Sequence, residues 1–318
     1  MTVLLMHDAM GNRQQLVYTA EFLADHGYRV VSFDFPGLGS KPNERLTMET
    51  AVASTREMVE RHCPGGSAVL CGFGMGGYVA MVFASVYPDM VKAMILCNTN
   101  FDLSGFSGSI ISNMMGAIYK ITPRKSLWSL VLQQHPTANK EKVTRCYLKN
   151  VVDYDKWSTC AALLAEPHQG YFREALRGYK GKVIMIIGDE DCKYAEDKFG
   201  SVIYDGSLSV IKGGHELMAI DDVTSTEFHQ VIDGFLETLN IKANTASPAS
   251  SSVSTMEIAS SGVASSSTAS SSSSTASSSN TTSAAKPTSS AKATAAVAKA
   301  TSSKITSAKA ASSSSSSS

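Results

Sequence analysis

Short apolar runs alternate with helix-like segments along residues 1–97, and this alternation limits most strongly what the chain can form. Val3–Met6 is a continuous apolar run closed by a polar, glycine-containing turn, as expected of a strand buried on both faces. Further strand-like runs lie at 29–33, 67–71 and 91–97, separated by helix-like segments at 15–26, 47–61 and 75–87. Right-handed crossovers then allow little besides an α/β fold with a mostly parallel sheet and helices on both faces.

The alternation stops between Asn98 and Gly181 and then resumes. The intervening stretch has helical periodicity and holds both tryptophans, Trp128 and Trp157. An insertion of about 80 residues between strands should carry structure of its own. Strands at 182–187 and 209–211 and a helix at about 224–239 are expected to complete the body.

The C-terminal quarter of the chain has a different composition. From Asn244 onward it is almost wholly Ser, Ala and Thr, which cannot bury enough apolar surface to offset the entropy of ordering a backbone. We therefore expect a body at 1–242 and a disordered tail at 243–318. The formal net charge is zero, and the tail's lysines leave the body mildly acidic, so the charge does not point to a nucleic-acid partner.

The six cysteines show no metal-ligand spacing, and Cys71 and Cys97 lie inside apolar runs. This indicates reduced thiols in a cytosolic type of compartment and no bound metal or cofactor. The apolar run at the N-terminus is too short for a signal peptide, and no apolar stretch reaches membrane-spanning length. We expect a cytoplasmic protein without a membrane partner.

Four glycine-containing motifs follow predicted strands in a fixed order. They are His7-Asp8-Ala9-Met10-Gly11, Gly72-Phe73-Gly74-Met75-Gly76-Gly77, Gly188-Asp189-Glu190-Asp191 and Gly213-Gly214-His215. In this order and these strand contexts they resemble the α/β-hydrolase superfamily over nearly all of residues 1–242. The turn at 34–40 is similar to the one after that family's fourth strand.

The resemblance implies roles for particular residues. The family's order of nucleophile, acid and histidine falls on Gly74, Asp191 and His215, so glycine occupies the place of the attacking serine. Asp189 and Glu190 are alternative acids, although the spacing favours Asp191. Cys71 and Cys192 are weaker candidates for a replacement nucleophile because neither lies at the tip of the turn.

The family's oxyanion hole is implied to consist of the backbone N–H groups of Ala9 and Met75. Asp8 stands where the family usually has glycine, and a carboxylate there should repel a developing negative charge unless it turns outward or is neutralised. His7 is expected to support the loop rather than to react. The insertion at about 99–180 resembles the family's helical cap and favours an apolar acyl, terpenoid or aromatic ligand.

Without a serine hydroxyl no acyl-enzyme can form, which favours a pseudoenzyme or an apolar small-molecule binder. Two alternatives stay open. The first is an enzyme that uses Asp191 and His215 as a general-base dyad for hydrolase, lyase or cofactor-free oxygenase chemistry. The second is an interaction protein that acts through its tail.

The resemblance also implies that the family's first two strands are missing here. The strand at 30–33 would then lose its outer neighbour and become an exposed edge.

Overall fold

The computed structural model describes residues 1–9, 11–99, 126, 159–160, 163–164, 170–189, 202–213, 222–240 and 257–258. Structural statements below refer to these residues.

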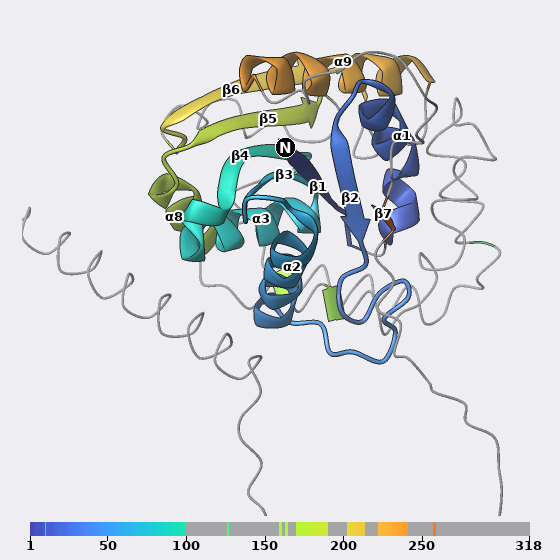
Figure 1. The fold of residues 1–318 in the computed structure, drawn as a ribbon, viewed down its shortest axis with the longest axis vertical. Coiled ribbons are helices and arrows are strands. Elements are labelled where there is room, and N and C mark those ends of the chain that lie inside the picture. Colours follow the sequence, from blue (N-terminus) through green and yellow to red (C-terminus); the bar gives the residue numbers. More distant parts are fainter. Residues whose placement is uncertain are drawn as a thin grey trace, which may run out of the picture. The chain divides into compact units, whose positions relative to one another are not determined.

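A seven-stranded sheet forms the centre of the molecule, with the strand order β6-β5-β4-β3-β1-β2-β7 (Figure 1). Every pair is parallel. The strands are β1 (Thr2–Met6), β2 (Arg29–Phe33), β3 (Ala68–Phe73), β4 (Val91–Cys97), β5 (Lys182–Gly188), β6 (Asp205–Ile211) and β7 (Glu257–Ile258). The predicted α/β fold is confirmed, and the apolar runs are buried because they lie in the middle of the sheet.

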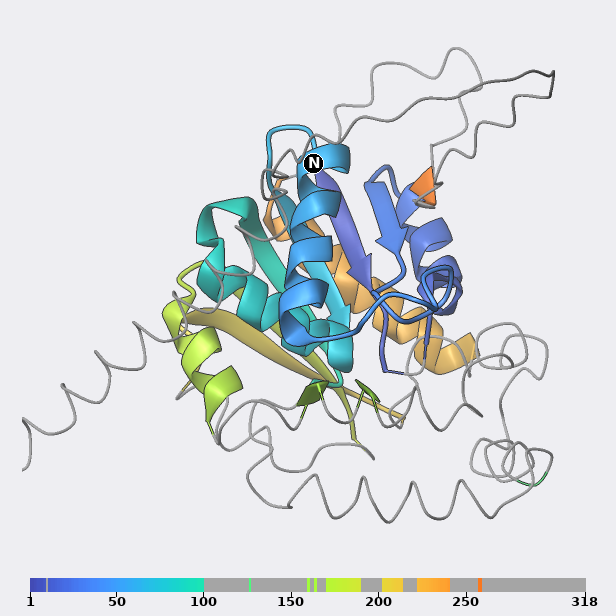
Figure 2. The ribbon, with the colours of Figure 1, turned by 90° about the horizontal axis from the view of Figure 1, so that it is seen from below.

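Helices cover both faces of this sheet (Figure 2). One face carries α1 (Val17–Asp25), which follows a short 3-10 helix η1 (Arg13–Leu16), together with α9 (Asp222–Thr238). The opposite face carries α2 (Met48–His62), α3 (Met75–Val86) and α8 (Tyr171–Gly178), and a second 3-10 helix, η2 (Pro88–Met90), links α3 to β4. One hydrophobic core cluster lies between the sheet and the α1–α9 layer.

Local signals set the helix ends. Thr47 and Thr50 form a capping box at the start of α2, in which each side chain accepts a hydrogen bond from the other residue's backbone N–H. Gly27 ends the α1 segment with φ 84°, as expected of a left-handed cap. These positions explain why the predicted and observed helices agree closely in this half of the chain.

The expected cap region at 99–180 lies largely outside the described residues. Its last part, α8, packs against α3 in the helical layer on one face of the sheet: the ring centroids of Tyr78 in α3 and Phe172 in α8 lie 4.4 Å apart. Residues from Tyr171 onward therefore belong to the layered body.

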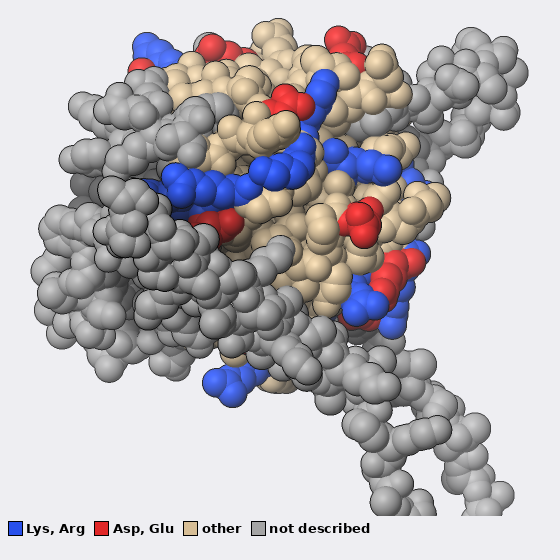
Figure 3. Space-filling view, turned by 90° about the vertical axis from the view of Figure 1, so that its left-hand side faces the viewer, with Lys and Arg blue, Asp and Glu red and all other residues tan. Residues whose placement is uncertain are grey.

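The β6 edge differs from the strands at the centre because most of its residues are not buried. Tyr204 is exposed just before it, and the Lys180 ammonium lies 4.6 Å from the centroid of that ring. Lys and Arg side chains cross this side of the molecule in a row (Figure 3).

The opposite edge differs from expectation. Val31 and Ser32 of β2 pair with Glu257 and Ile258 of β7, so β2 is not left without an outer neighbour. This short strand comes from the segment expected to be disordered, whose other residues lie outside the described part of the chain. The compact unit that contains the sheet runs to Ile258.

No helix among the described residues is both long enough and apolar enough to cross a lipid bilayer.

Candidate active-site region

A sharp turn between β3 and α3 lies at the carboxyl edge of the sheet. Gly74 is the single residue between them, with φ 46° and ψ −111°, a conformation that costs other residues about 1–3 kcal/mol. Its N–H donates to the Cys97 carbonyl at 2.9 Å, and its carbonyl accepts the Thr99 hydroxyl at 3.2 Å. The end of β4 therefore holds the turn in place.

Close approach of backbones explains the other glycines of this turn. A Cβ on Gly72 would lie 2.5 Å from the Gly77 nitrogen, and one on Gly76 would lie 2.3 Å from the Met6 carbonyl oxygen. Real Cβ atoms do not come this close to backbone, so a side chain at either position would push α3 away from β1 and β3. The motif thus keeps the N-terminus of α3 directly above the sheet.

Asp8, two residues after β1, turns its carboxylate inward to this turn. Its Oδ1 accepts hydrogen bonds from the Met75 N–H at 2.7 Å and from the Ala9 N–H at 2.6 Å. The Met75 N–H belongs to the first turn of α3, where amides have no partner within the helix and negative charge is stabilised. The two amides expected to form an oxyanion hole do converge on one point, and Asp8 Oδ1 occupies that point.

The same carboxylate fills the space beside Gly74. A Cβ on Gly74 would lie 1.9 Å from Asp8 Oδ1 and 2.3 Å from Asp8 Cγ. The possibility that Asp8 turns outward is therefore wrong. Asp8 is also buried, with 9% of its surface exposed.

His7 joins the loops that follow β1 and β2. Its Nε2 accepts the Phe35 N–H at 3.1 Å, which requires that Nε2 carry no proton, and its Nδ1 donates to the Asp8 carbonyl at 2.8 Å. Burial lowers the pKa of His7 below its ordinary value of 6.5, although the Asp8 carbonyl, Asp34 and Asp8 act in the opposite direction. The neutral ring thus joins the two loops through these hydrogen bonds.

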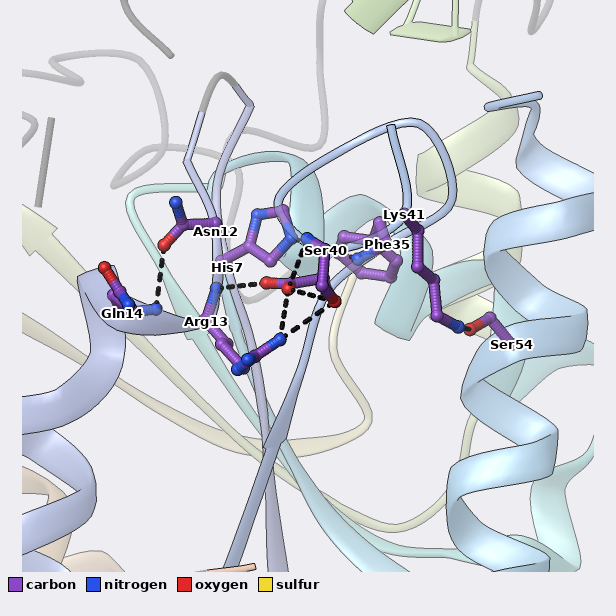
Figure 4. Close-up of polar contacts among 9 residues, drawn as sticks. His7, Asn12, Arg13, Gln14, Phe35, Ser40, Lys41 and Ser54 are labelled. Carbon is purple, nitrogen blue, oxygen red and sulfur yellow. Dashed lines mark hydrogen bonds and ion pairs between the residues drawn. The ribbon is translucent and has the colours of Figure 1, made fainter. Parts of the chain in front are cut away.

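Asp34, directly after β2, joins the same two loops through its carboxylate. Figure 4 labels its partners Arg13 and Ser40 and draws these contacts as dashed lines. Oδ1 accepts the Arg13 N–H at 2.7 Å, and Oδ2 accepts the Arg13 guanidinium at 2.5 Å. Oδ2 also accepts the Ser40 N–H and hydroxyl, both at 2.8 Å. Burial alone would raise the pKa of Asp34, but these hydrogen bonds lower it below its ordinary value of 3.8.

The predicted acid and histidine, Asp191 and His215, lie outside the described residues, as does Glu190. The start of each loop is described: Asp189 Oδ1 accepts the Gly213 N–H at 2.9 Å. Asn98, at the end of β4 with φ 44°, accepts the Gly188 N–H through Oδ1 at 2.9 Å. The segments that lead to Asp191 and His215 therefore leave the sheet side by side.

The described cysteines are buried free thiols: Cys63, Cys71, Cys97 and Cys160. Burial raises the pKa of Cys97 well above its ordinary value of 9.0, and the adjacent Cys71 thiol raises it further. Burial also raises the pKa of Cys63 to about 11. Such thiols are poor nucleophiles at neutral pH. Within the described ranges, no three His, Cys, Asp or Glu side chains gather into a group able to hold a metal ion.

Three contributions to this region were not predicted from the sequence. They are the inward carboxylate of Asp8 and the bracing contacts of Asn98 and Thr99. The sequence shows that Asp8 stands in place of glycine in this motif. It does not show the direction in which the Asp8 carboxylate points. Asn98 and Thr99 follow a predicted strand as ordinary polar residues, and nothing nearby marks them.

Comparisons with known proteins agree with this architecture. A family model described as serine aminopeptidase, S33, matches residues 1–191. A curated AB hydrolase superfamily protein from Gibberella zeae is 24% identical over 100 residues, which are 31% of this chain and 36% of that protein. The match thus spans only about a third of the relative's length.

Solved structures show the same fold at low identity. A thermophilic esterase from Thermogutta terrifontis has a TM-score of 0.60 at 20% identity, covering 75% of this chain and 90% of the esterase. An enol-lactonase from Burkholderia xenovorans has a TM-score of 0.60 at 17% identity, covering 74% and 91%. A putative non-heme bromoperoxidase from Mycobacterium tuberculosis has a TM-score of 0.60 at 17% identity, covering 75% and 92%. Since the family model matches more than half of the residues, the chain belongs to the serine aminopeptidase S33 family of the α/β-hydrolase superfamily.

Proposed function

We propose that this chain is a hydrolase-family protein without classical esterase or lipase activity, and that it binds an apolar small molecule instead of cleaving it. The observation that carries the proposal is Gly74. It is the single residue between β3 and α3, and its φ of 46° and ψ of −111° form the sharp strand-to-helix turn on which this superfamily places its nucleophile.

Loss of the hydroxyl removes the covalent route. Acyl transfer in this superfamily needs an oxygen at the turn to attack the carbonyl, and a histidine and an acid cannot replace that oxygen. Glycine keeps the turn because it adopts positive φ without strain. The backbone would therefore survive this replacement while the chemistry would not.

The ligand class follows from the family. Two solved structures with this fold are an esterase and an enol-lactonase, and their names support a ligand with an ester-like carbonyl group. The segment at 99–180 is rich in Leu and aromatic residues, which favours an apolar ligand such as an acyl, terpenoid or aromatic compound.

The test is ester hydrolysis by the purified full chain, with p-nitrophenyl acetate and p-nitrophenyl octanoate, beside a His215→Ala control. We expect no difference between the parent chain and the control. Thermal shift measurements with neutral esters, lactones and aromatic amides then test binding. Turnover by the parent that disappears in His215→Ala would overturn the proposal and favour the Asp191–His215 dyad as the catalyst.

A further inference from the structure

We propose that Asp8 is a second determinant of the missing activity, because its carboxylate acts as an internal ligand of the site. It binds the amides of Ala9 and Met75 where a substrate's carbonyl oxygen would bind. This inference rests on the proposed function. It implies that a serine at position 74 is not enough to restore hydrolysis unless the Asp8 side chain is also removed.

The first argument is steric. A Cβ on Gly74 would lie 1.9 Å from Asp8 Oδ1 and 2.7 Å from Asp8 Oδ2, far inside van der Waals contact. A serine side chain adds an oxygen beyond that Cβ. Gly74→Ser and the observed Asp8 conformation therefore exclude one another.

The second argument concerns the two amides. Their distances to Asp8 Oδ1, 2.6 Å from Ala9 and 2.7 Å from Met75, lie at or below the short end of the range for charge-assisted hydrogen bonds. A tetrahedral intermediate needs these donors for its own oxyanion. A substrate would have to displace the carboxylate or develop negative charge directly beside it.

The third argument is that the Asp8 backbone is anchored, so the side chain cannot leave by a simple loop movement. The Asp8 N–H donates to Gln15 Oε1 at 3.1 Å, and the Asp8 carbonyl accepts the Gly11 N–H at 3.1 Å and the His7 imidazole at 2.8 Å. These contacts hold the residue from both sides. Removing the side chain, rather than moving the loop, is the direct way to empty the site.

Two matched replacements separate the shape of Asp8 from its charge. Asp8→Ala removes the carboxylate and frees both amides. Asp8→Asn keeps an oxygen acceptor of the same size without the negative charge, so it still fills the site and still collides with a side chain at position 74. If occupancy is the cause, only alanine restores reactivity; if charge alone is the cause, asparagine does so as well.

The experiment uses the full chain as parent, Gly74→Ser, Asp8→Ala/Gly74→Ser and Asp8→Asn/Gly74→Ser, with His215→Ala added to the alanine double variant. The readout is the rate of labelling by a fluorophosphonate, measured by intact mass. In that reaction the introduced hydroxyl attacks phosphorus, its proton passes to the His215 imidazole, and fluoride leaves.

We expect the alanine double variant to be labelled at least tenfold faster than either Gly74→Ser alone or the asparagine double variant, and to lose this rate with His215→Ala. Equal rates for Gly74→Ser and the alanine double variant overturn the inference, as does silence in every variant. Rapid labelling of the asparagine double variant overturns occupancy as the cause.

A second readout does not depend on activity. Gly74→Ser should lower the Tm of the parent by at least twice as much as it lowers the Tm of Asp8→Ala, because the collision exists only in the parent. Tm losses of equal size in both backgrounds contradict the inference. The proposed function fails separately, through His215-dependent ester hydrolysis by the parent chain.

Discussion

Asp8 and Asp34 follow neighbouring parallel strands at the same edge of the sheet, yet their carboxylates have different surroundings. Asp34 is bound by the Arg13 guanidinium and by backbone and side-chain groups of Ser40, so a cation balances its charge. Asp8 Oδ1 is bound by the backbone amides of Ala9 and Met75. One carboxylate joins two loops, and the other fills the space that a side chain at position 74 would need.

The difference shows that the position of an acid at the end of a strand does not define its role. The donors around the acid do. A guanidinium with a hydroxyl indicates a structural brace. Two backbone amides, of which the Met75 amide lies at a helix N-terminus, indicate an anion site, which in this chain already contains the Asp8 carboxylate. The predictions below test this contrast through stability.

The largest effect is expected for the brace. Asp34→Ala should lower the free energy of unfolding by about 3 kcal/mol, because it leaves the partly buried Arg13 guanidinium and the Ser40 amide without their acceptor. Ser40→Ala is the matched control, with a loss of about 1 kcal/mol, because it removes the hydroxyl that donates to Asp34 and accepts from the Arg13 guanidinium but leaves the Asp34–Arg13 ion pair in place. Urea unfolding measures both. Equal losses would show that the Asp34 carboxylate is not the centre of this cluster.

A smaller loss is expected at the turn. Gly74→Ala should cost about 2 kcal/mol, from its positive φ and from the collision with Asp8. In the Asp8→Ala background only the backbone term remains, so the coupling between the two positions should be about 1 kcal/mol. A double-mutant cycle by urea unfolding measures it. Additive losses would show that Asp8 does not interact with a side chain at position 74.

His7, which lies between the two aspartates, should make stability depend on pH. The pKa of His7 in the folded chain lies below 6.5. As pH falls below 6.5, the unfolded chain therefore binds a proton that the folded chain does not yet bind. Stability is therefore full above that pH and falls below it, by at most about 1.4 kcal/mol per pH unit. Urea unfolding at pH 7.5 and 5.5 tests this, with His7→Gln as a non-titrating control. If the stability difference between pH 7.5 and pH 5.5 is the same in His7→Gln as in the parent, a group other than His7 causes it.

The carboxylate of Asp34 affects stability at a lower pH, since its stabilisation is lost only as pH falls below 3.8.

The smallest effect is expected for Asp8→Ala alone, at about 1 kcal/mol, close to the loss of a helix N-cap. Water can enter the emptied space and bind the amides of Ala9 and Met75. The comparison predicts that this loss stays well below that of Asp34→Ala in the same measurement. If Asp8→Ala loses more free energy of unfolding than Asp34→Ala, Asp8 stabilises the fold more than Asp34 does.

Burial decided how much of the fold could be predicted. The predicted bounds of strands β1 to β5 lie within a few residues of the observed ones. These strands are buried on both faces, so their sequences are apolar runs. For β6 only 209–211 was expected, although the strand begins at Asp205, because its first residues are polar, contain a glycine and lie at an exposed edge. The two residues of β7 have no apolar run around them, and their pairing with β2 depends on contacts distant in sequence.

The candidate site was predicted in its backbone and not in its side chains. The glycine motif located the turn at Gly74 and the amide of Met75, because close backbone approach restricts which residues fit there. The direction of the Asp8 carboxylate depends on the position of α3 in space, which no local pattern contains. Asp191 and His215 remain predictions, and the hydrogen bond from the Gly213 N–H to Asp189 joins the last described residues before them.

The hydrogen bonds of Asp8 bear on how ligands of this protein can be found. A carboxylate between two amides is what a hydrolase holds after it has cleaved an ester, and in this chain the Asp8 side chain places a carboxylate between two amides. Reactive-probe surveys and libraries of acids or boronates select for a vacant anion site, and they should pass over this protein. Neutral compounds that bind by their shape are the better candidates. Mass spectrometry of the molecules that co-purify with the chain can detect them.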